Sequence, residues 1–132
     1  MLKVAKPCYE EMIEDAKRRL PNEACGLLAG KGDVADVFYG MTNSEQNSVS
    51  YMMDPQEQFQ VAKEMRRRGE AMRGIYHSHV ATQAYPSAKD VSLAFYSNVH
   101  YVIVSLEERQ HPQARAFRIE EGSVREEPIE LV

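Results

Sequence analysis

Gly74-Ile75-Tyr76-His77-Ser78-His79 reads as the end of a buried strand that carries two histidines. Side chains at positions i and i+2 of a strand project from the same face, so the imidazoles of His77 and His79 can reach one ion. Ser78 then points the opposite way, which favours a packing or supporting role. Two polar residues at a strand end that bind nothing also fit this pattern. The histidine pair therefore indicates a metal site only together with a third ligand.

Asp90 is the candidate for that third ligand. Pro86 favours an extended loop over residues 80–86, and Ser87 opens a helix in which Asp90 lies one turn further on. The loop can fold this helix start back over the strand end. Ser87-Ala88-Lys89-Asp90 also matches an ordinary capping box, and capping and metal binding are compatible. Three protein ligands leave one tetrahedral position open for water, as is typical of catalytic zinc.

The flanking sequence predicts a mixed α/β fold. An amphipathic helix over residues 9–20 precedes a buried strand at 24–30, whose hairpin partner covers 34–41. A second helix starts at the cap Asp54, with Glu57 completing a capping box and an inward stripe of Phe59, Ala62 and Met65, and it stops near Gly69.

The second half of the chain continues this alternation. Residues 72–77 predict a strand, and the helix opened by Ser87 is expected to turn an apolar face inward. That face consists of Val91, Leu93, Ala94 and Phe95. A central strand follows at 101–106, and Glu121-Gly122 forms the turn of a hairpin between strands at 114–120 and 123–131. Because the alternation ends in a hairpin, the sheet is expected to be mixed.

Composition limits the classes of protein to which the chain can belong. The 132 residues, 43% of them hydrophobic, predict a single domain spanning 1–132. A net charge of -4 argues against a nucleic-acid partner, and the cluster Arg66-Arg67-Arg68 reads as a solvated helix end. Neither a membrane span nor a secretion signal is evident, and two isolated cysteines, Cys8 and Cys25, suit a reducing compartment. We therefore expect a cytoplasmic location.

His-x-His, seven residues, Ser, two residues and Asp resembles the JAMM motif of the MPN+ zinc metallopeptidases. The family pattern includes an upstream glutamate, which Glu23 matches in Pro21-Asn22-Glu23-Ala24-Cys25-Gly26-Leu27-Leu28. Segments 74–79, 84–87 and 101–106 are similar to short bacterial members, so the resemblance covers most of the chain. The family has a proline after the second histidine where this chain has Val80, which affects the path of the loop 80–86 but none of the ligands.

The resemblance implies a JAB/MPN fold, a curved mixed sheet flanked by helices with an architecture related to cytidine deaminases. It implies that His77, His79 and Asp90 hold Zn²⁺ and that Glu23 is the general base. Ser87 would donate its hydroxyl to the oxyanion that develops on the attacked carbonyl.

The short bacterial branch implies a substrate class as well. Its members cleave the amide bond after the C-terminal Gly-Gly of a ubiquitin-like sulfur-carrier protein, removing an extension or a cysteine. Alternatives are a non-catalytic MPN-like scaffold, or a peptidase for another peptide such as a cell-wall or phage-associated one. A cytidine-deaminase activity would need H-x-E followed by P-C-x-x-C, which the chain lacks. Oligomeric state is left open.

Overall fold

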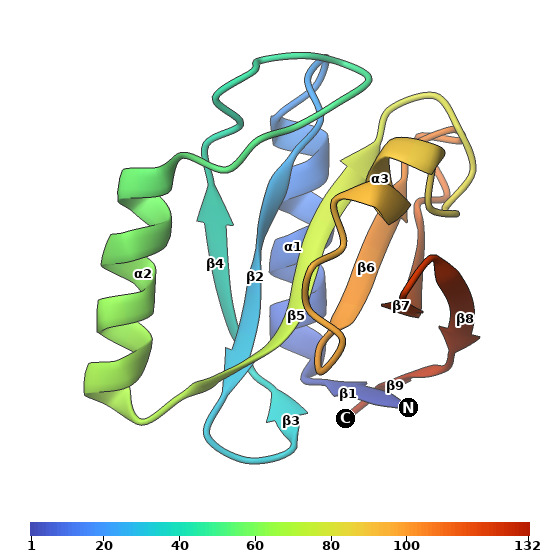
Figure 1. Ribbon diagram of the computed structural model, residues 1–132. Helices are drawn as coiled ribbons and strands as arrows, with labels where there is room; N and C mark the ends of the chain where they lie inside the picture. The colour runs from blue at the N-terminus through green and yellow to red at the C-terminus, as the bar shows by residue number, and fades with distance from the viewer.

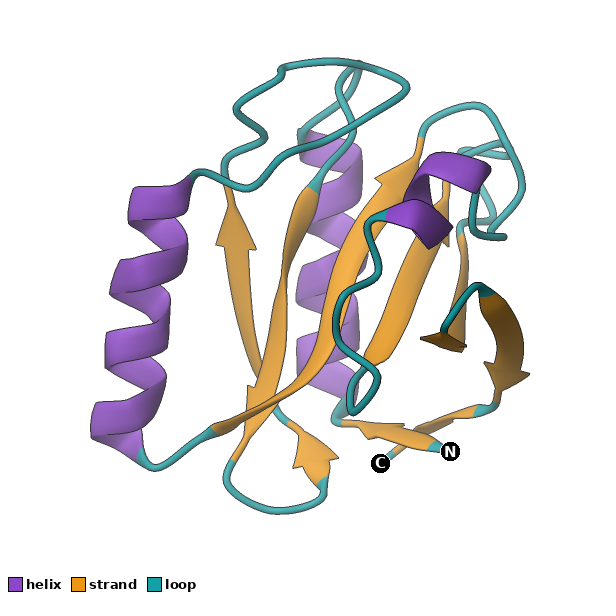
Figure 2. Cartoon of the chain, in the orientation of Figure 1, coloured by secondary structure: helices purple, strands orange, loops and turns teal.

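The computed structural model describes residues 1–132 as a mixed α/β fold (Figures 1 and 2). Its elements, in chain order, are β1 (Leu2–Val4), α1 (Lys6–Arg18), β2 (Cys25–Gly30), β3 (Val34–Ala35), β4 (Val37–Met41), α2 (Pro55–Arg68), β5 (Ala71–His79), α3 (Ala88–Ser92), β6 (His100–Ser105), β7 (Gln113–Glu120), β8 (Ser123–Glu127) and β9 (Ile129–Leu131). None of the helices has the length and apolar character that crossing a membrane requires.

Six strands form the main sheet in the order β4-β2-β5-β6-β7-β8. Neighbours are antiparallel except β5 and β6, which run parallel. Parallel neighbours need a crossover, so the chain leaves the sheet at the carboxyl end of β5, and α3 lies in the connection that returns it to β6 (Figure 1). The prediction of a mixed sheet is therefore confirmed.

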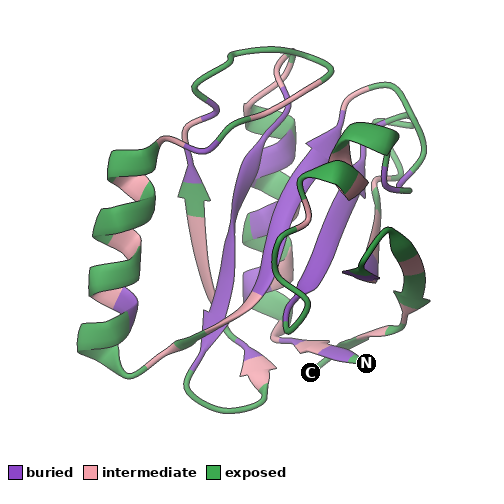
Figure 3. Cartoon of the chain, in the orientation of Figure 1, coloured by how far each residue is buried: buried purple, intermediate pink, exposed green.

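The main sheet carries a packed core on each face, which is why β6 and the part of β5 from Gly74 to His79 are buried (Figure 3). On one face, α1 packs Met12 and Ala16 against Leu28 and Tyr76. On the other, Met65 of α2 joins a cluster that includes Cys25, Ile75 and Phe117. The histidine-bearing end of β5 is thereby held from both sides.

A β-bulge interrupts the pairing of β5 with β2. Leu28 pairs with Gly74 but Ala29 pairs with Met72, so Arg73 is the extra residue. Because side chains alternate along a strand, Met72 and Ile75 could not otherwise face the same core, yet both pack in the cluster that contains Cys25. The bulge therefore determines which side chains of the rest of β5 point to each face of the sheet.

Two turn predictions are confirmed by backbone geometry. α2 ends at Gly69, which adopts the left-handed conformation with φ of 71°. The hairpin between β7 and β8 turns at Glu121 and Gly122, whose φ values are 49° and 81°. Two successive residues with positive φ match the twist of a tight hairpin.

The smaller sheet, in the order β3-β1-β9, was missed. The strand expected at 34–41 is divided into β3, which pairs with β1, and β4, which pairs with β2. The strand expected at 123–131 is likewise divided at Pro128 into β8 and β9, since proline cannot donate to a strand ladder. Strands of two or three residues are too short to show a periodic pattern.

The helix after Ser87 is shorter than expected. It ends at Ser92, and Leu93 and Phe95 of the predicted inward face are 49% and 77% exposed. Val91 and Ala94 do pack against the core. After Ser92 the chain leaves the helix and reaches the buried Val99, the residue that precedes β6.

The inward stripe predicted for α2 is also largely wrong. Met65 is buried, but Ala62 is exposed and Phe59 is 63% exposed. The helix lies near β4 at one edge of the sheet (Figure 1) and contacts both β4 and β5, so only the side of it that carries Met65 meets the core. Asp54 caps it as predicted, whereas Glu57 accepts hydrogen bonds from the Thr42 amide and hydroxyl and does not complete a capping box.

Candidate metal centre

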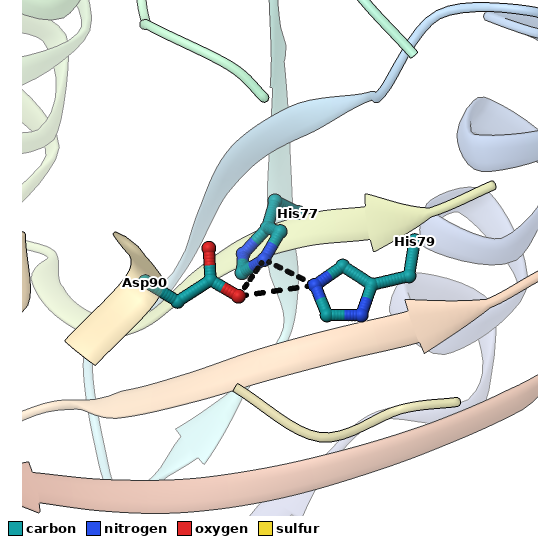
Figure 4. Close-up of side chains that lie close together, drawn as sticks. All are labelled: His77, His79 and Asp90. Carbon is teal, nitrogen blue, oxygen red and sulfur yellow. Dashed lines mark hydrogen bonds and ion pairs between the residues drawn. The ribbon is translucent and has the colours of Figure 1, made fainter. Parts of the chain in front are cut away.

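His77 and His79 project from the end of β5 toward Asp90 on α3 (Figure 4). The two Nε2 atoms lie 3.2 Å apart, and Asp90 Oδ2 lies 3.2 Å from that of His77 and 3.0 Å from that of His79. The structure therefore brings together the three residues whose spacing predicted a ligand set, and they can hold a metal ion.

The donor atoms suit a cation. His79 Nδ1 donates to the Gln83 carbonyl at 2.8 Å, which fixes the ring so that Nε2 is the nitrogen facing His77 and Asp90. With zinc–ligand bonds of about 2.0–2.1 Å, two ligand atoms of a tetrahedral site lie about 3.3 Å apart, within a few tenths of the separations found here. Nδ1 of His77 is buried without a hydrogen-bond partner.

The pKa values of the three groups reflect their mutual contact. Burial would raise the pKa of Asp90, but hydrogen bonds to His77 and His79 hold it far below its ordinary value. Burial lowers the pKa of His77. It also acts to lower that of His79, but hydrogen bonds with Asp90 and the Gln83 carbonyl outweigh it and raise the pKa. Asp90 is thus anionic, as a metal ligand must be.

The predicted capping box at the start of α3 is present. Ser87 Oγ accepts from the Asp90 amide at 3.1 Å, and Asp90 Oδ2 accepts from the Ser87 amide at 2.8 Å. Capping uses an acceptor lone pair of the Ser87 hydroxyl and leaves its hydrogen free to donate. The same contact orients the Asp90 carboxylate toward the histidines.

Glu23 lies two residues before the start of β2 and is only 5% exposed. Its amide donates to the Asn47 carbonyl at 2.8 Å, and its carbonyl accepts from Asn43 Nδ2 at 3.1 Å. Burial raises the pKa of its carboxyl to about 7, with opposing contributions from the charges of His79, which lowers it, and Asp90, which raises it. Glu23 is therefore a buried carboxyl close to the cluster with a pKa suited to proton exchange near neutrality.

Ser78 connects Glu23 to the histidine strand. It is fully buried, its Oγ accepts from the Ala24 amide at 2.8 Å, and its own amide donates to the Ala24 carbonyl at 3.0 Å. The supporting role predicted for Ser78 is confirmed. Because Ala24 follows Glu23 directly, these bonds fix the position of the Glu23 backbone relative to the strand that carries His77 and His79.

Two residues of this region were missed by sequence reasoning. Tyr51 stacks on His77, with ring centroids 4.6 Å apart and planes inclined by 22°. The side-chain amide of Asn43 makes four hydrogen bonds. Its Nδ2 donates to the carbonyls of Glu23 and Ser50, and its Oδ1 accepts from the amides of Glu45 and Met52. These bonds fix the loop beside Glu23. The polar composition of residues 42–50 indicated a loop but gave no sign of these contacts.

A mixed sheet that presents two histidines from a strand end and an aspartate from the following helix defines a JAB/MPN-type domain with a candidate metal site. The chain belongs to the family of prokaryotic homologs of the JAB domain, whose model matches residues 5–120. The family resemblance derived from the motif is confirmed.

Named relatives and solved structures agree with this assignment. The chain is 42% identical to the CysO-cysteine peptidase of Mycobacterium tuberculosis over 92% of this chain and 84% of the relative. It is 31% identical to a probable TtuB-protein conjugate cleaving protease of Thermus thermophilus over 92% and 78% of the two chains. A protein from Desulfitobacterium hafniense is 44% identical with a TM-score of 0.89, covering 100% of this chain and 93% of that one. A JAB1/MPN domain protein from Archaeoglobus fulgidus, 22% identical with a TM-score of 0.66 over 98% of both chains, shares the fold.

Proposed function

We propose that this protein is a zinc-dependent peptidase that hydrolyses the amide bond after the C-terminal Gly-Gly of a ubiquitin-like sulfur-carrier protein. The observation that carries the proposal is the convergence of His77, His79 and Asp90 on one point, together with the buried carboxyl of Glu23, whose pKa responds to the charges of His79 and Asp90. We also propose that residues 1–132 form one domain. The two free thiols, Cys8 and Cys25, suit a cytoplasmic location.

His77 Nε2, His79 Nε2 and Asp90 Oδ2 would hold the zinc ion. Zinc bound by three protein ligands supplies Lewis acidity, lowering the pKa of a water at its open position and polarising the scissile carbonyl. Nitrogen and oxygen donors of this kind are ordinary zinc ligands. The hydrogen bond from His79 Nδ1 to the Gln83 carbonyl holds that ring in the orientation that binding requires.

Glu23 is proposed to move the proton. Its carboxylate accepts a proton from the attacking water as the oxygen bonds to the carbonyl carbon. It then delivers that proton to the amide nitrogen as the carbon–nitrogen bond breaks. Water is thus divided between the two products, a carboxylate on the carrier and a free amine. A pKa near neutrality allows Glu23 both to accept and to release the proton.

Ser87 is proposed to stabilise the oxyanion. Its hydroxyl hydrogen is not used in capping α3 and can be donated to the oxygen on which negative charge develops. Because Ser87 lies one turn from Asp90, the donor is placed close to the metal ligands.

The substrate class rests on the named relatives and on the shape of the loops. Two relatives are named for their substrates. One is a CysO-cysteine peptidase and the other a probable TtuB-protein conjugate cleaving protease. A Gly-Gly tail carries no side chains, so it can enter a narrow site in extended form. Only the short loop 80–86 separates β5 from the start of α3, which leaves little room for a second ubiquitin-like protein.

The test compares the zinc-loaded wild type with Glu23→Gln on a carrier that ends in Gly-Gly plus a C-terminal extension. Intact mass should show trimming to Gly-Gly by the wild type alone. Zinc binding without trimming would direct the search to other peptides, such as cell-wall or phage-associated ones. Failure to bind zinc would favour a non-catalytic scaffold.

A further inference from the structure

Lys89 lies on α3, next to Asp90 in the sequence, and its charge acts on the Glu23 carboxyl. Its Nζ lies 3.6 Å from Oε1 of Glu45, a residue of the loop that Asn43 fixes beside Glu23. The pair therefore joins the helix that carries Asp90 to the loop that contains Glu45. About half of the Lys89 side chain is exposed, so the contact is open to exchange with an incoming anion.

The charge of Lys89 acts close to the point where Glu23 exchanges its proton. Four charged groups influence the Glu23 carboxyl, namely His79, Asp90, Lys89 and Glu45. Lys89 is the only lysine or arginine among them. The proposed reaction needs no such cation, since the metal ligands, the base and the oxyanion donor are supplied by other residues.

The position of Lys89 suits the α-carboxylate of a substrate whose leaving group is a free amino acid. In the proposed mechanism Glu23 delivers its proton to the leaving nitrogen, so that nitrogen lies beside Glu23. When the leaving group is a free amino acid, its α-carboxylate is only two bonds from this nitrogen. A lysine side chain that leaves from an isopeptide bond has no carboxylate there.

We infer that Lys89 binds the free α-carboxylate of a single amino acid joined to the carrier's terminal glycine, and so directs the enzyme toward carrier–amino acid adducts and away from isopeptide conjugates. This inference rests on the proposed function. The substrate carboxylate replaces Glu45 as the partner of Lys89, and the reaction itself is unchanged.

The test uses the zinc-loaded full chain and two carriers that differ in one group. One ends in Gly-Gly-Cys with a free carboxylate and the other in Gly-Gly-Cys amide. The wild type should cleave the acid with a kcat/KM about tenfold above that of the amide, the effect of one partly exposed charge-assisted contact. The difference should lie in KM and shrink as salt is added.

Three variants separate charge recognition from a structural role. Lys89→Met should cleave both carriers at equal rates, and Lys89→Arg should keep the preference for the acid. Lys63→Met, which removes a lysine on the remote and exposed α2, is the matched control and should behave as the wild type. Glu45→Gln removes the competing carboxylate and should lower KM for the acid only.

The outcomes are distinguishable. Equal cleavage of acid and amide by the wild type, or a preference that survives in Lys89→Met, overturns the role of Lys89 and leaves the peptidase intact. Absence of cleavage of both carriers by zinc-loaded wild type overturns the proposed function together with this inference.

Discussion

Glu23 and Asp90 are carboxylates of the same site whose surroundings move their pKa values in opposite directions. Burial raises the pKa of Glu23 to about 7. Burial acts in the same sense on Asp90, but hydrogen bonds from His77, His79 and the Ser87 amide hold its pKa far below the ordinary range. One carboxylate is therefore suited to exchanging a proton and the other to remaining an anionic ligand.

Substitution of these two residues should separate metal binding from catalysis. Asp90→Ala removes a ligand, and we expect it to lose zinc, as measured by metal analysis after dialysis. Glu23→Gln should retain zinc and lose at least about 100-fold in kcat, because only the proton acceptor is removed. Full turnover by Glu23→Gln would eliminate Glu23 as the base.

The dependence of kcat/KM on pH should show an acidic limb due to Glu23. Only the carboxylate form accepts a proton, so activity falls as pH drops through its pKa. That pKa is about 7 in the metal-free protein. Bound zinc favours the anionic form, so the limb of the loaded enzyme should lie below this value. A limb above pH 7 would assign it to a different group.

At the scale of secondary structure, α3 combines two roles in five residues, Ala88–Ser92. Its capping box holds the helix start, and the same two side chains are the proposed metal ligand, Asp90, and the proposed oxyanion donor, Ser87. Stability of this turn and geometry of the metal centre are therefore coupled.

Ser87→Ala should test this coupling against Asp54→Ala, which removes the cap of α2. Each change should cost about 1 kcal/mol of unfolding free energy through loss of a cap. Only Ser87→Ala should also lower kcat, by about 100-fold, because only Ser87 is proposed to donate to the oxyanion. Denaturant unfolding and steady-state kinetics measure the two effects, and equal kcat values for both variants would reduce Ser87 to a cap.

At the scale of the whole molecule, Glu127 at the end of β8 is tied to the start of β6. It accepts a hydrogen bond from His100 Nε2 at 2.7 Å, and it also bonds the N-terminal amine and Arg125. These contacts, with His100 first, lower the pKa of Glu127 to about 2. The C-terminal strands are thus joined to the sheet by a contact that depends on an ionised carboxylate.

Glu127→Gln should therefore destabilise the protein in a pH-dependent way. Since the folded pKa lies below the ordinary value of 4.5, the stabilisation is present in full above pH 4.5 and is lost as pH falls toward 2. The difference in unfolding free energy between wild type and variant, followed by urea denaturation, should shrink over that window. A difference that does not change with pH would point to packing as its source.

The candidate site was largely predictable because its ligands lie close together in the sequence. His77, His79 and Asp90 come from one strand and the turn of helix after it, so local periodicity and spacing indicated that they could meet, and the family resemblance implied their role as ligands. Tyr51 and Asn43 reach the site through long-range packing and left no local pattern. The contribution of Glu23 to the site was implied by family resemblance and not by its own surroundings in the sequence.

The fold was predictable where elements are long and their apolar pattern is complete. β2, β5 and β6 were found for this reason, with β5 extending further than expected at its ends. β1, β3 and β9 are too short for a period to show. The exposure of Phe59 on α2 arises from where that helix lies beside the sheet, which sequence periodicity does not encode.

The bulge at Arg73 divides β5 into two parts with separate tasks. Residues before it follow α2, and residues after it present His77 and His79. A residue inserted or deleted near Gly69 changes the pairing register only in the part of β5 before the bulge. The register of the part after the bulge is unchanged. The connection from α2 is thus free to vary in evolution or design, while the spacing of the two histidines and their distance from Glu23 stay constant.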